Sequence, residues 1–344
     1  MISIFIPVYN GENYLSQTLD SVLGQSYADW EVLCVDDSST DGSLGILDNY
    51  ASKDSRVHVL SKPNGGCVPP SWVFVMPHLR GEFTLYMSQD DLLEPDSLQL
   101  MVEKQMETKA DAVIVKEFLL FEDRKENSRI PYGIPELLDK TISGKDALRL
   151  MIDYQISGFA LWSTSIIKSV GISTETYNAD ELAQRQWVSQ CERVAFSRGV
   201  FLYRCDNPVA ITKLHSPLHY QSILTDARLL QLVEKELVGE VDLINELANL
   251  YFFQLYKLMI LFVQHKHQYS KTERKRIKPF FRKAYQVLYS RTTLPNWKYR
   301  LSKQNYFLMW MVVLFKKSQY ALRGVDLIDD MDMRPIKTPR RYLH

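Results

Sequence analysis

The first hundred residues alternate short apolar, strand-like runs with helical patterns, and the strand-like runs end in polar, turn-prone clusters. The predicted strands are Ile2–Val8, Glu31–Val35, Val57–Leu60 and Phe83–Met87. Apolar residues at helical spacing predict helices over Asn13–Gly24 and Ser43–Tyr50. Strands separated by helices indicate right-handed βαβ units and a parallel sheet. Ligands of such sheets sit beyond the carboxyl ends of the strands, so the polar clusters are candidate site loops.

A second α/β portion follows, and a helical region comes after it. The second portion contains the apolar runs Ala112–Phe121 and Phe159–Ile167, helices over Gly144–Asp153 and Glu181–Arg193, and a predicted strand-turn-strand over Val194–Arg204. From about Pro217 the pattern is helical, with breaks around Gly239, Ser270 and Pro295. Leu247–Val263 is the most apolar stretch, but polar residues interrupt it, and we expect a buried helix rather than a membrane span.

The net charge of zero hides an asymmetry along the chain. Residues 257–323 contain 16 Lys and Arg against the single acid Glu273, a net charge of +15, whereas residues 1–256 carry −15. An acidic body with a basic segment near the C-terminus predicts that the segment meets an anionic partner. A nucleic-acid role, suggested by aromatic residues within the basic segment, is the weakest of the functions considered, and we expect no nucleic-acid partner.

The four cysteines form neither a CxxC motif nor metal-ligand spacing; they are Cys34, Cys67, Cys191 and Cys205. This pattern predicts buried, reduced thiols in a cytoplasmic protein. The N-terminal residues Met1–Pro7 lack the basic region of a signal peptide, which also favours the cytoplasm.

Pairs of acids mark three places where chemistry is expected. Asp36–Asp37 follows an apolar strand, where the carboxylates can accept a nucleoside N–H or hydroxyl, or cap the next helix. Asp90–Asp91 follows another strand and offers hard oxygen ligands for Mg²⁺ or Mn²⁺ bridging a diphosphate, or is a solvated acidic cap. Asp180–Glu181 begins a predicted helix, where a carboxylate serves as a cap or as a general base.

Six separated motifs within residues 1–100 occur together in the order and approximate spacing of one enzyme family. They are Pro7-Val8-Tyr9-Asn10, Leu19-Asp20-Ser21-Val22-Leu23, Val35-Asp36-Asp37-Ser38-Ser39, Asn64-Gly65-Gly66, Gly81-Glu82-Phe83 and Gln89-Asp90-Asp91. The chain therefore resembles family 2 glycosyltransferases with the GT-A fold, and the likeness continues weakly to about residue 215. It implies an α/β fold with a Rossmann-like, mostly parallel central sheet, followed by a helical C-terminal region.

The resemblance also implies an inverting transfer from a nucleotide-sugar, commonly UDP-linked, to an acceptor hydroxyl. The nucleotide-binding residues that it implies are Pro7, Val8, Tyr9, Asp36, Asp37, Asn64, Gly65, Gly66, Gln89 and Asp90. Asp36 would support its loop, and Asp180, or failing that Glu181, would deprotonate the acceptor. The implied metal ligands for Mn²⁺ or Mg²⁺ are Asp90, Asp91 and, from the region that supplies a histidine in some members, His215 in preference to His219.

Two positions depart from the family pattern. Ser88 stands where the metal-binding DxD motif has its first acid, which puts metal affinity in doubt. After Gly66 the family usually has Arg-Asn-x-Gly, whereas this chain has Pro69-Pro70-Ser71-Trp72, a change that would alter how the donor sugar is held.

These observations predict a glycosyltransferase domain over 1–215, with a nucleotide-binding half at 1–100 and an acceptor half at 101–215, and a basic helical region over 216–344. The expected function is synthesis of a bacterial-type surface polysaccharide, with a glycan or lipid-linked acceptor. The alternative is a non-catalytic nucleotide-sugar binder, which the departure at Ser88 makes plausible. The charge asymmetry also allows a homo-oligomer in which a basic tail meets a neighbour's acidic body.

The apolar segment Tyr306–Phe315 sits inside the basic region and leaves two alternatives open. A helix of this length spans about 15 Å, half of a bilayer core, and so it cannot cross. It is either a buried helix or a helix in the membrane interface, with Trp310 at headgroup depth and residues 257–323 attracting anionic lipid. The second alternative predicts peripheral attachment to the inner face of the membrane, close to a lipid-linked acceptor.

Overall fold

The computed structural model describes residues 1–121, 130–132, 134–211, 216–292, 306–311 and 313–314. Two compact units are present: a sheet unit of residues 1–174 and 183–214, and a helical unit of residues 175–182 and 215–344.

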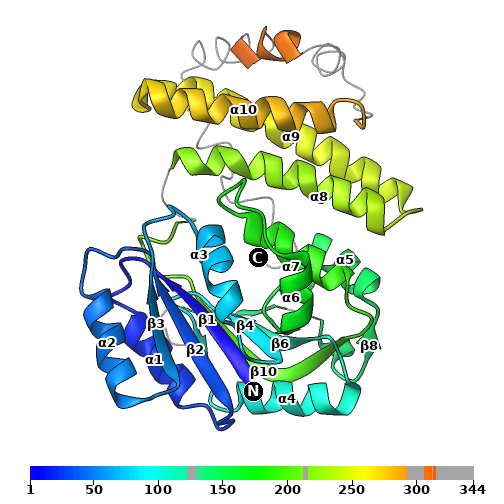
Figure 1. Ribbon diagram of the computed structural model, residues 1–344. Coiled ribbons are helices and arrows are strands. Elements are labelled where there is room, and N and C mark those ends of the chain that lie inside the picture. The colour runs from blue at the N-terminus through cyan, green and yellow to red at the C-terminus, as the bar shows by residue number, and fades with distance from the viewer. Residues whose placement is uncertain (122–129, 133, 212–215, 293–305, 312, 315–344) are drawn as a thin grey trace. The chain divides into compact units, whose positions relative to one another are not determined.

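A 10-stranded sheet with the order β3-β2-β1-β4-β9-β6-β10-β5 forms the centre of the sheet unit (Figure 1). Its strands on this path are β1 (Ile2–Val8), β2 (Trp30–Asp36), β3 (Val57–Ser61), β4 (Phe83–Tyr86), β5 (Leu92–Leu93), β6 (Ala112–Phe121), β9 (Ala160–Ser163) and β10 (Val194–Arg204). The short strands β7 (Ile130–Tyr132) and β8 (Thr141–Ile142) pair with β6 and β10. The neighbours β3, β2, β1 and β4 are parallel, whereas β9 is antiparallel to both β4 and β6. The sheet is mixed and mostly parallel, which confirms the predicted fold class.

The sheet unit departs most clearly from the predicted elements at one helix and one strand, and its helices are given in chain order. They are α1 (Leu15–Leu23), α2 (Ser43–Lys53), α3 (Val68–Val75), α4 (Ser97–Thr108), α5 (Gly144–Ile152) and α6 (Thr164–Val170). The first difference is α3, which contains the two prolines of the family departure in its first turn, where a missing N–H costs nothing. The second is β10, one continuous strand with a register shift between Ser197 and Val200 rather than a strand-turn-strand.

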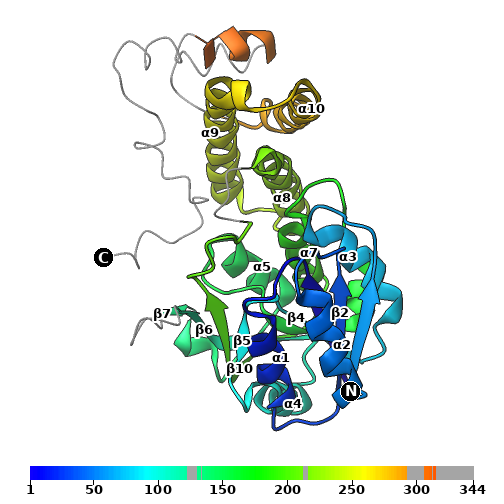
Figure 2. The same ribbon diagram turned by 90° about the vertical axis from the view of Figure 1, so that its left-hand side faces the viewer.

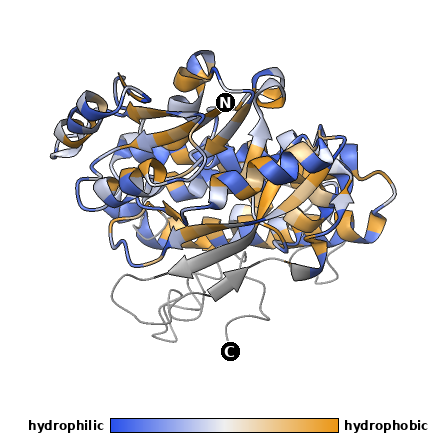
Figure 3. Cartoon of the chain, turned by 90° about the horizontal axis from the view of Figure 1, so that it is seen from below, coloured by the Kyte–Doolittle hydropathy of each residue, from blue (hydrophilic) through white to orange (hydrophobic). Residues whose placement is uncertain are grey.

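The core of the sheet unit consists of the inward faces of the strands and the apolar faces of the helices around them. β1 and β2 are buried along almost their whole length, as expected for parallel strands covered on both faces. Figure 3 shows the strands largely in hydrophobic colours and the surrounding helices with mixed ones. Trp72 of α3 is fully buried against Phe5 and Trp187, with ring centroids 4.6 and 5.2 Å away. The family departure at this position therefore supplies a core residue.

The helical unit contains α8 (Ser222–Glu236), α9 (Val241–His265) and α10 (Lys271–Leu288), which pack against one another (Figure 2). α7 (Ala179–Ser189) begins in this unit and ends in the sheet unit. Gly239 has a φ of 108° between α8 and α9, and Ser270 caps α10 through a capping box, so both predicted breaks are found. Pro295 lies outside the described residues.

Within the described part of the chain, one helix, at 241–268, is long and apolar enough to cross a membrane. Of its most apolar window, 61% is buried inside the protein. Leu247, Phe252, Leu255 and Met259 lie among its buried residues. This burial confirms the expectation of a buried helix over Leu247–Val263.

The cysteine prediction is partly confirmed. None of the four described cysteines forms a disulfide; Cys34 and Cys191 are buried, and burial raises the pKa of each to about 12. Cys67 and Cys205 are instead half-buried, because both lie in loops next to strand or helix ends.

Candidate functional site: the carboxyl edge of the sheet

The loops that follow β1 and β2 are tied together by side chains at the carboxyl edge of the sheet. Asn10 donates its backbone N–H to Ser39 Oγ at 3.0 Å, and its own Oδ1 accepts the N–H of Thr40 at 2.8 Å. Gly11 donates its N–H to Ser43 Oγ at 2.8 Å. Both carboxylate oxygens of Asp36 accept the N–H of Ser39, at 3.2 and 3.3 Å. These hydrogen bonds join the two loops, which together are called the lip.

Asp37 occupies the centre of this lip and is almost fully buried. Its backbone N–H bonds to the carbonyl of Val8 at 2.8 Å, which continues the pairing of β1 with β2. Its carboxylate forms an ion pair with the ammonium of Lys62 and accepts the N–H of Gly65 at 2.9 and 3.1 Å. A buried carboxylate needs such partners, because an unpaired charge is costly inside a protein. Lys62, which sequence reasoning missed, therefore holds Asp37 in place.

The turn after β3 brings Gly65 of the fourth motif, Asn64-Gly65-Gly66, to Asp37. Asn64 accepts the N–H of Gly66 through Oδ1 at 2.7 Å, an Asx turn, and Gly66 has a φ of 77°. A side chain at Gly66 would be strained by this backbone conformation. The exposed residues Asn64, Gly65 and Gly66 leave the loop open to an approaching ligand.

Gln89 connects the loop after β4 to the loop after β1. It accepts the N–H of Tyr9 at 2.8 Å and donates Nε2 to the carbonyl of Tyr9 at 3.0 Å. The hydroxyl of Thr18 donates to the carbonyl of Gln89 at 2.8 Å. Tyr9, 48% exposed, is therefore presented on a clamped backbone.

The adjacent acids Asp90 and Asp91 have different surroundings. Asp90 is half-buried, and Asn207 Nδ2 donates to its Oδ2 at 2.7 Å. Asp91 is 1% exposed, and its oxygens accept the N–H groups of Arg204 at 3.1 Å and Ser88 at 3.3 Å. Burial, and then the charge of Asp90, raise the pKa of Asp91 well above its ordinary value. This placement does not favour the predicted ligand role for Asp91, which instead closes the turn below Asp90.

Arg204, at the end of β10, contacts the turn that contains Asp90 and Asp91. Its Nε donates to the carbonyl of Asp90 at 2.9 Å, and another nitrogen donates to Gln17 Oε1 at 2.5 Å. Its guanidinium lies 4.5 Å from the centre of the Tyr14 ring. The sequence assigned no role to Arg204 or Asn207, although both lie before residue 215, where the likeness to the family is weak.

The predicted base residues lie at the start of α7. Asp180 and Glu181 are both half-buried, and Asn178 Nδ2 donates to Glu181 Oε2 at 3.1 Å. The His219 ring centre lies 5.5 Å from that of Tyr177. His215, the preferred histidine ligand, lies outside the described residues. Among the described residues, no group of three or more His, Cys, Asp or Glu is arranged to hold a metal ion.

Residues 3–171 match the sequence model described as glycosyl transferase family 2. Residues 3–171 therefore form a glycosyl transferase family 2 domain. The predicted family 2 motifs lie together at the carboxyl ends of β1 to β4 in the structure. They are residues 7–10, 36–37, 64–66 and 89–91.

Named relatives extend the likeness over parts of the chain. Chondroitin synthase of Pasteurella multocida is 35% identical over 114 residues, which are 33% of this chain and 12% of the synthase. TuaG of Bacillus subtilis, named for teichuronic acid biosynthesis, is 30% identical over 165 residues, 46% of this chain and 64% of TuaG. The matches thus span less than two thirds of either relative.

The fold is also found in a solved structure of S. aureus TarS 1-349 in complex with UDP-GlcNAc. That structure superposes with a TM-score of 0.62, covering 95% of this chain and 94% of the TarS chain at 18% identity. At this identity the likeness establishes the fold alone.

Proposed function

We propose that the protein is an inverting glycosyltransferase of cell-surface polysaccharide synthesis. It takes a sugar from a nucleotide-sugar, UDP-linked, and transfers it to a hydroxyl of a glycan or a lipid-linked acceptor in the cytoplasm. Family 2 membership supports the reaction class, and the relative named for teichuronic acid biosynthesis supports the polysaccharide. The UDP-GlcNAc complex of TarS supports the donor class.

The observation that carries this proposal is the Asp37 arrangement at the carboxyl edge. Lys62 and the N–H of Gly65 fix the carboxylate, while Tyr9 lies exposed on the neighbouring loop. A fixed carboxylate accepts a base N–H or a ribose hydroxyl without first losing conformational freedom. The nucleoside would lie between Pro7–Tyr9 and Asn64–Gly66.

Asp90 is the residue best placed to hold Mn²⁺ or Mg²⁺. Within the described residues its one side-chain hydrogen bond, from Asn207, engages Oδ2 and leaves Oδ1 for a ligand. One protein carboxylate fits these ions, which take most of their other oxygens from substrate phosphates and water. When bound, the ion neutralises charge on the diphosphate. Ser88 in place of a second acid predicts weak affinity for the ion when no nucleotide is present.

Asp180 is proposed as the base that removes the proton of the acceptor hydroxyl, with Glu181 as the alternative. The acceptor oxygen then bonds to the anomeric carbon while the bond from that carbon to the diphosphate oxygen breaks. The nucleoside diphosphate leaves with the electron pair, and a single displacement inverts the anomeric centre.

A panel of nucleotide-sugars, each with and without Mn²⁺, tests the donor by thermal shift. A true donor at a hundredfold excess over its dissociation constant should stabilise the fold by about 2.7 kcal/mol. Release of free UDP from the donor, with and without glycan acceptors, then separates an enzyme from a non-catalytic binder. Stabilisation without any turnover would replace the proposal by the binder, whereas no stabilisation by any nucleotide-sugar would refute both.

A further inference from the structure

The helical unit presents a basic row beside an exposed apolar stripe. Residues 306–311 and 313–314 are helical and pack on α9 and α10 through Trp310, whose ring centre lies 6.3 Å from Phe262 and 6.1 Å from Phe281. Trp310 therefore contacts the helical core, as the alternative of a buried helix predicts. Tyr306 contacts Tyr285 with ring centres 5.2 Å apart.

The opposite side of this helical segment is apolar and exposed. Phe307, Met311 and Leu314 have exposed fractions of 67%, 52% and 46%, whereas Met309 and Val313 are fully buried. The exposed residues are spaced i, i+4, i+7 and thus share one face. The sequence left open a buried helix or a helix in the membrane interface. The structure has features of both, because one face of the segment packs in the core and another face is exposed.

A row of four exposed basic residues runs along α10 at matching helical spacing: Lys271, Lys275, Lys278 and Arg282. Arg282 lies three residues before Tyr285 on α10, and the Tyr285 ring centre lies 5.2 Å from that of Tyr306, so the end of the row lies close to the apolar segment. The one acid of α10, Glu273, is engaged at the helix start, where its carboxylate accepts the N–H of Ser270 at 2.7 Å. α10 therefore carries seven Lys and Arg against one acid, a strongly positive helix.

We propose that this surface, the basic row of α10 together with the apolar stripe 307/311/314, docks on an anionic lipid bilayer. Basic residues near a bilayer attract anionic headgroups, while a Phe-Met-Leu stripe enters the boundary between headgroups and acyl chains. A soluble polyanion would use the row but leave the stripe in water. A second copy of the same surface would bring like charges together. The bilayer is the occupant that uses both features.

Vesicle flotation of the full chain tests the proposal. The vesicles are phosphatidylcholine alone, or phosphatidylcholine with about one third phosphatidylglycerol, at low salt and at about 1 M salt, where the Debye length is about 3 Å. We expect recovery with the anionic vesicles at low salt and its loss at high salt. Equal recovery under all conditions, or none under any, would overturn the proposal.

Two triple variants separate the basic and apolar contributions. Lys275→Gln/Lys278→Gln/Arg282→Gln should lower partitioning about a hundredfold, at about fivefold for each charge near the surface. Phe307→Ser/Met311→Ser/Leu314→Ser should lower it at least about tenfold with every charge retained. The control Lys53→Gln/Lys109→Gln/Lys145→Gln removes the same charge from exposed positions of the sheet unit and should partition like the unmodified protein.

Because all nine positions are exposed, we expect the variants to keep their folded state, which thermal unfolding checks. If the basic variant loses binding while the apolar variant does not, the surface binds polyanions rather than membranes, and the proposal is wrong. If the control loses as much as the basic variant, net charge alone explains the binding. The readout is vesicle recovery, so either failure leaves the proposed sugar transfer untouched.

Discussion

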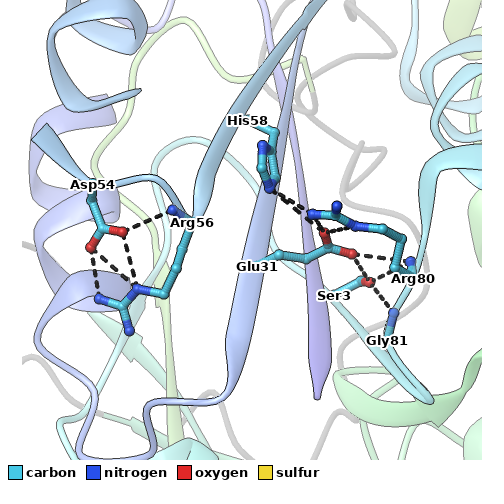
Figure 4. A network of polar contacts seen from close by, with 7 residues as sticks. All are labelled: Ser3, Glu31, Asp54, Arg56, His58, Arg80 and Gly81. Carbon is cyan, nitrogen blue, oxygen red and sulfur yellow. Dashed lines mark hydrogen bonds and ion pairs between the residues drawn. The ribbon is translucent and has the colours of Figure 1, made fainter. Parts of the chain in front are cut away.

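At the amino end of the parallel strands, the carboxylate of Glu31 on β2 accepts three hydrogen bonds. The hydroxyl of Ser3 donates at 2.6 Å, and Arg80 donates its backbone N–H at 3.0 Å and its Nε at 2.6 Å. Gly81 donates to Ser3 Oγ at 2.7 Å, and His58 lies beside the Arg80 guanidinium (Figure 4). At the carboxyl end of the same strand, Asp37 is held by two partners, whereas its neighbours Asn64–Gly66 and Tyr9 are exposed.

The contrast shows how one strand can serve two purposes. Glu31 is 2% exposed and its two oxygens are occupied by the protein, so it joins the segment before β4 to β1 and β2. At the carboxyl edge Asp37 is also held by the protein, but the residues around it, Tyr9 and Asn64–Gly66, are exposed to a ligand. Changes at the amino edge should therefore affect stability, and changes at the carboxyl edge should affect ligand binding.

The largest effect is expected at neither edge. Asp180→Asn should lower the rate of sugar transfer about 10²–10⁴-fold, because it removes the proposed base, while the affinity for UDP stays nearly unchanged. Rates from UDP release and affinities from calorimetry measure the two separately. Full turnover by Asp180→Asn but not by Glu181→Gln would assign the base to Glu181, and full turnover by both variants would place it elsewhere.

Asp37→Asn tests the carboxyl edge and should weaken UDP binding about 10–100-fold. The substitution keeps the shape of the side chain but loses a charged acceptor, worth about 1.5–3 kcal/mol in a hydrogen bond. Calorimetry with UDP gives the affinity, and Glu31→Gln is the matched control at the other end of the strand. An unchanged affinity in Asp37→Asn, or an equal loss in the control, would remove the functional distinction between the edges.

Asp90→Ala should abolish the part of UDP affinity that depends on Mn²⁺, about tenfold or about 1.4 kcal/mol. Titrations with and without Mn²⁺ should then coincide for the variant and differ for the unmodified protein. A metal effect that survives in Asp90→Ala would show that another group holds the ion.

Much of the sheet and of its site loops was predictable because the signals are local. The strands β1 to β4 and the helices between them have their own apolar periods, and the carboxyl ends of parallel strands share an edge. α3 was missed because its prolines suggest a loop, although both occupy the first helical turn. A strand-turn-strand was predicted over Val194–Arg204, where β10 is instead one strand with a register shift between Ser197 and Val200.

The supporting residues of the site were not predictable from local patterns. Asn207 meets Asp90 across 117 residues of sequence, and Arg204 meets Gln17 across 187. No period or motif spans such separations, and polar residues after a strand usually indicate only a turn. Glu31 gave no signal either, because a single acid in an apolar strand identifies no partner.

Glu31→Gln gives the smallest expected effect. It should lower the free energy of unfolding by about 1 kcal/mol at neutral pH, because Arg80 is largely exposed and solvent screens the ion pair. Burial alone would raise the pKa of Glu31, but hydrogen bonds from Arg80 and Ser3 outweigh burial and lower it. A carboxyl whose pKa is lowered by folding stabilises the protein above its unfolded pKa, and loses that contribution as pH falls through the folded value. Denaturant unfolding measures the free energy of unfolding of the unmodified protein and of Glu31→Gln, at neutral pH and below the ordinary Glu pKa of 4.5. The difference between the two free energies should be smaller in acid. A difference that stays constant over this range would mean that packing of the side chain, rather than its charge, supports the amino edge.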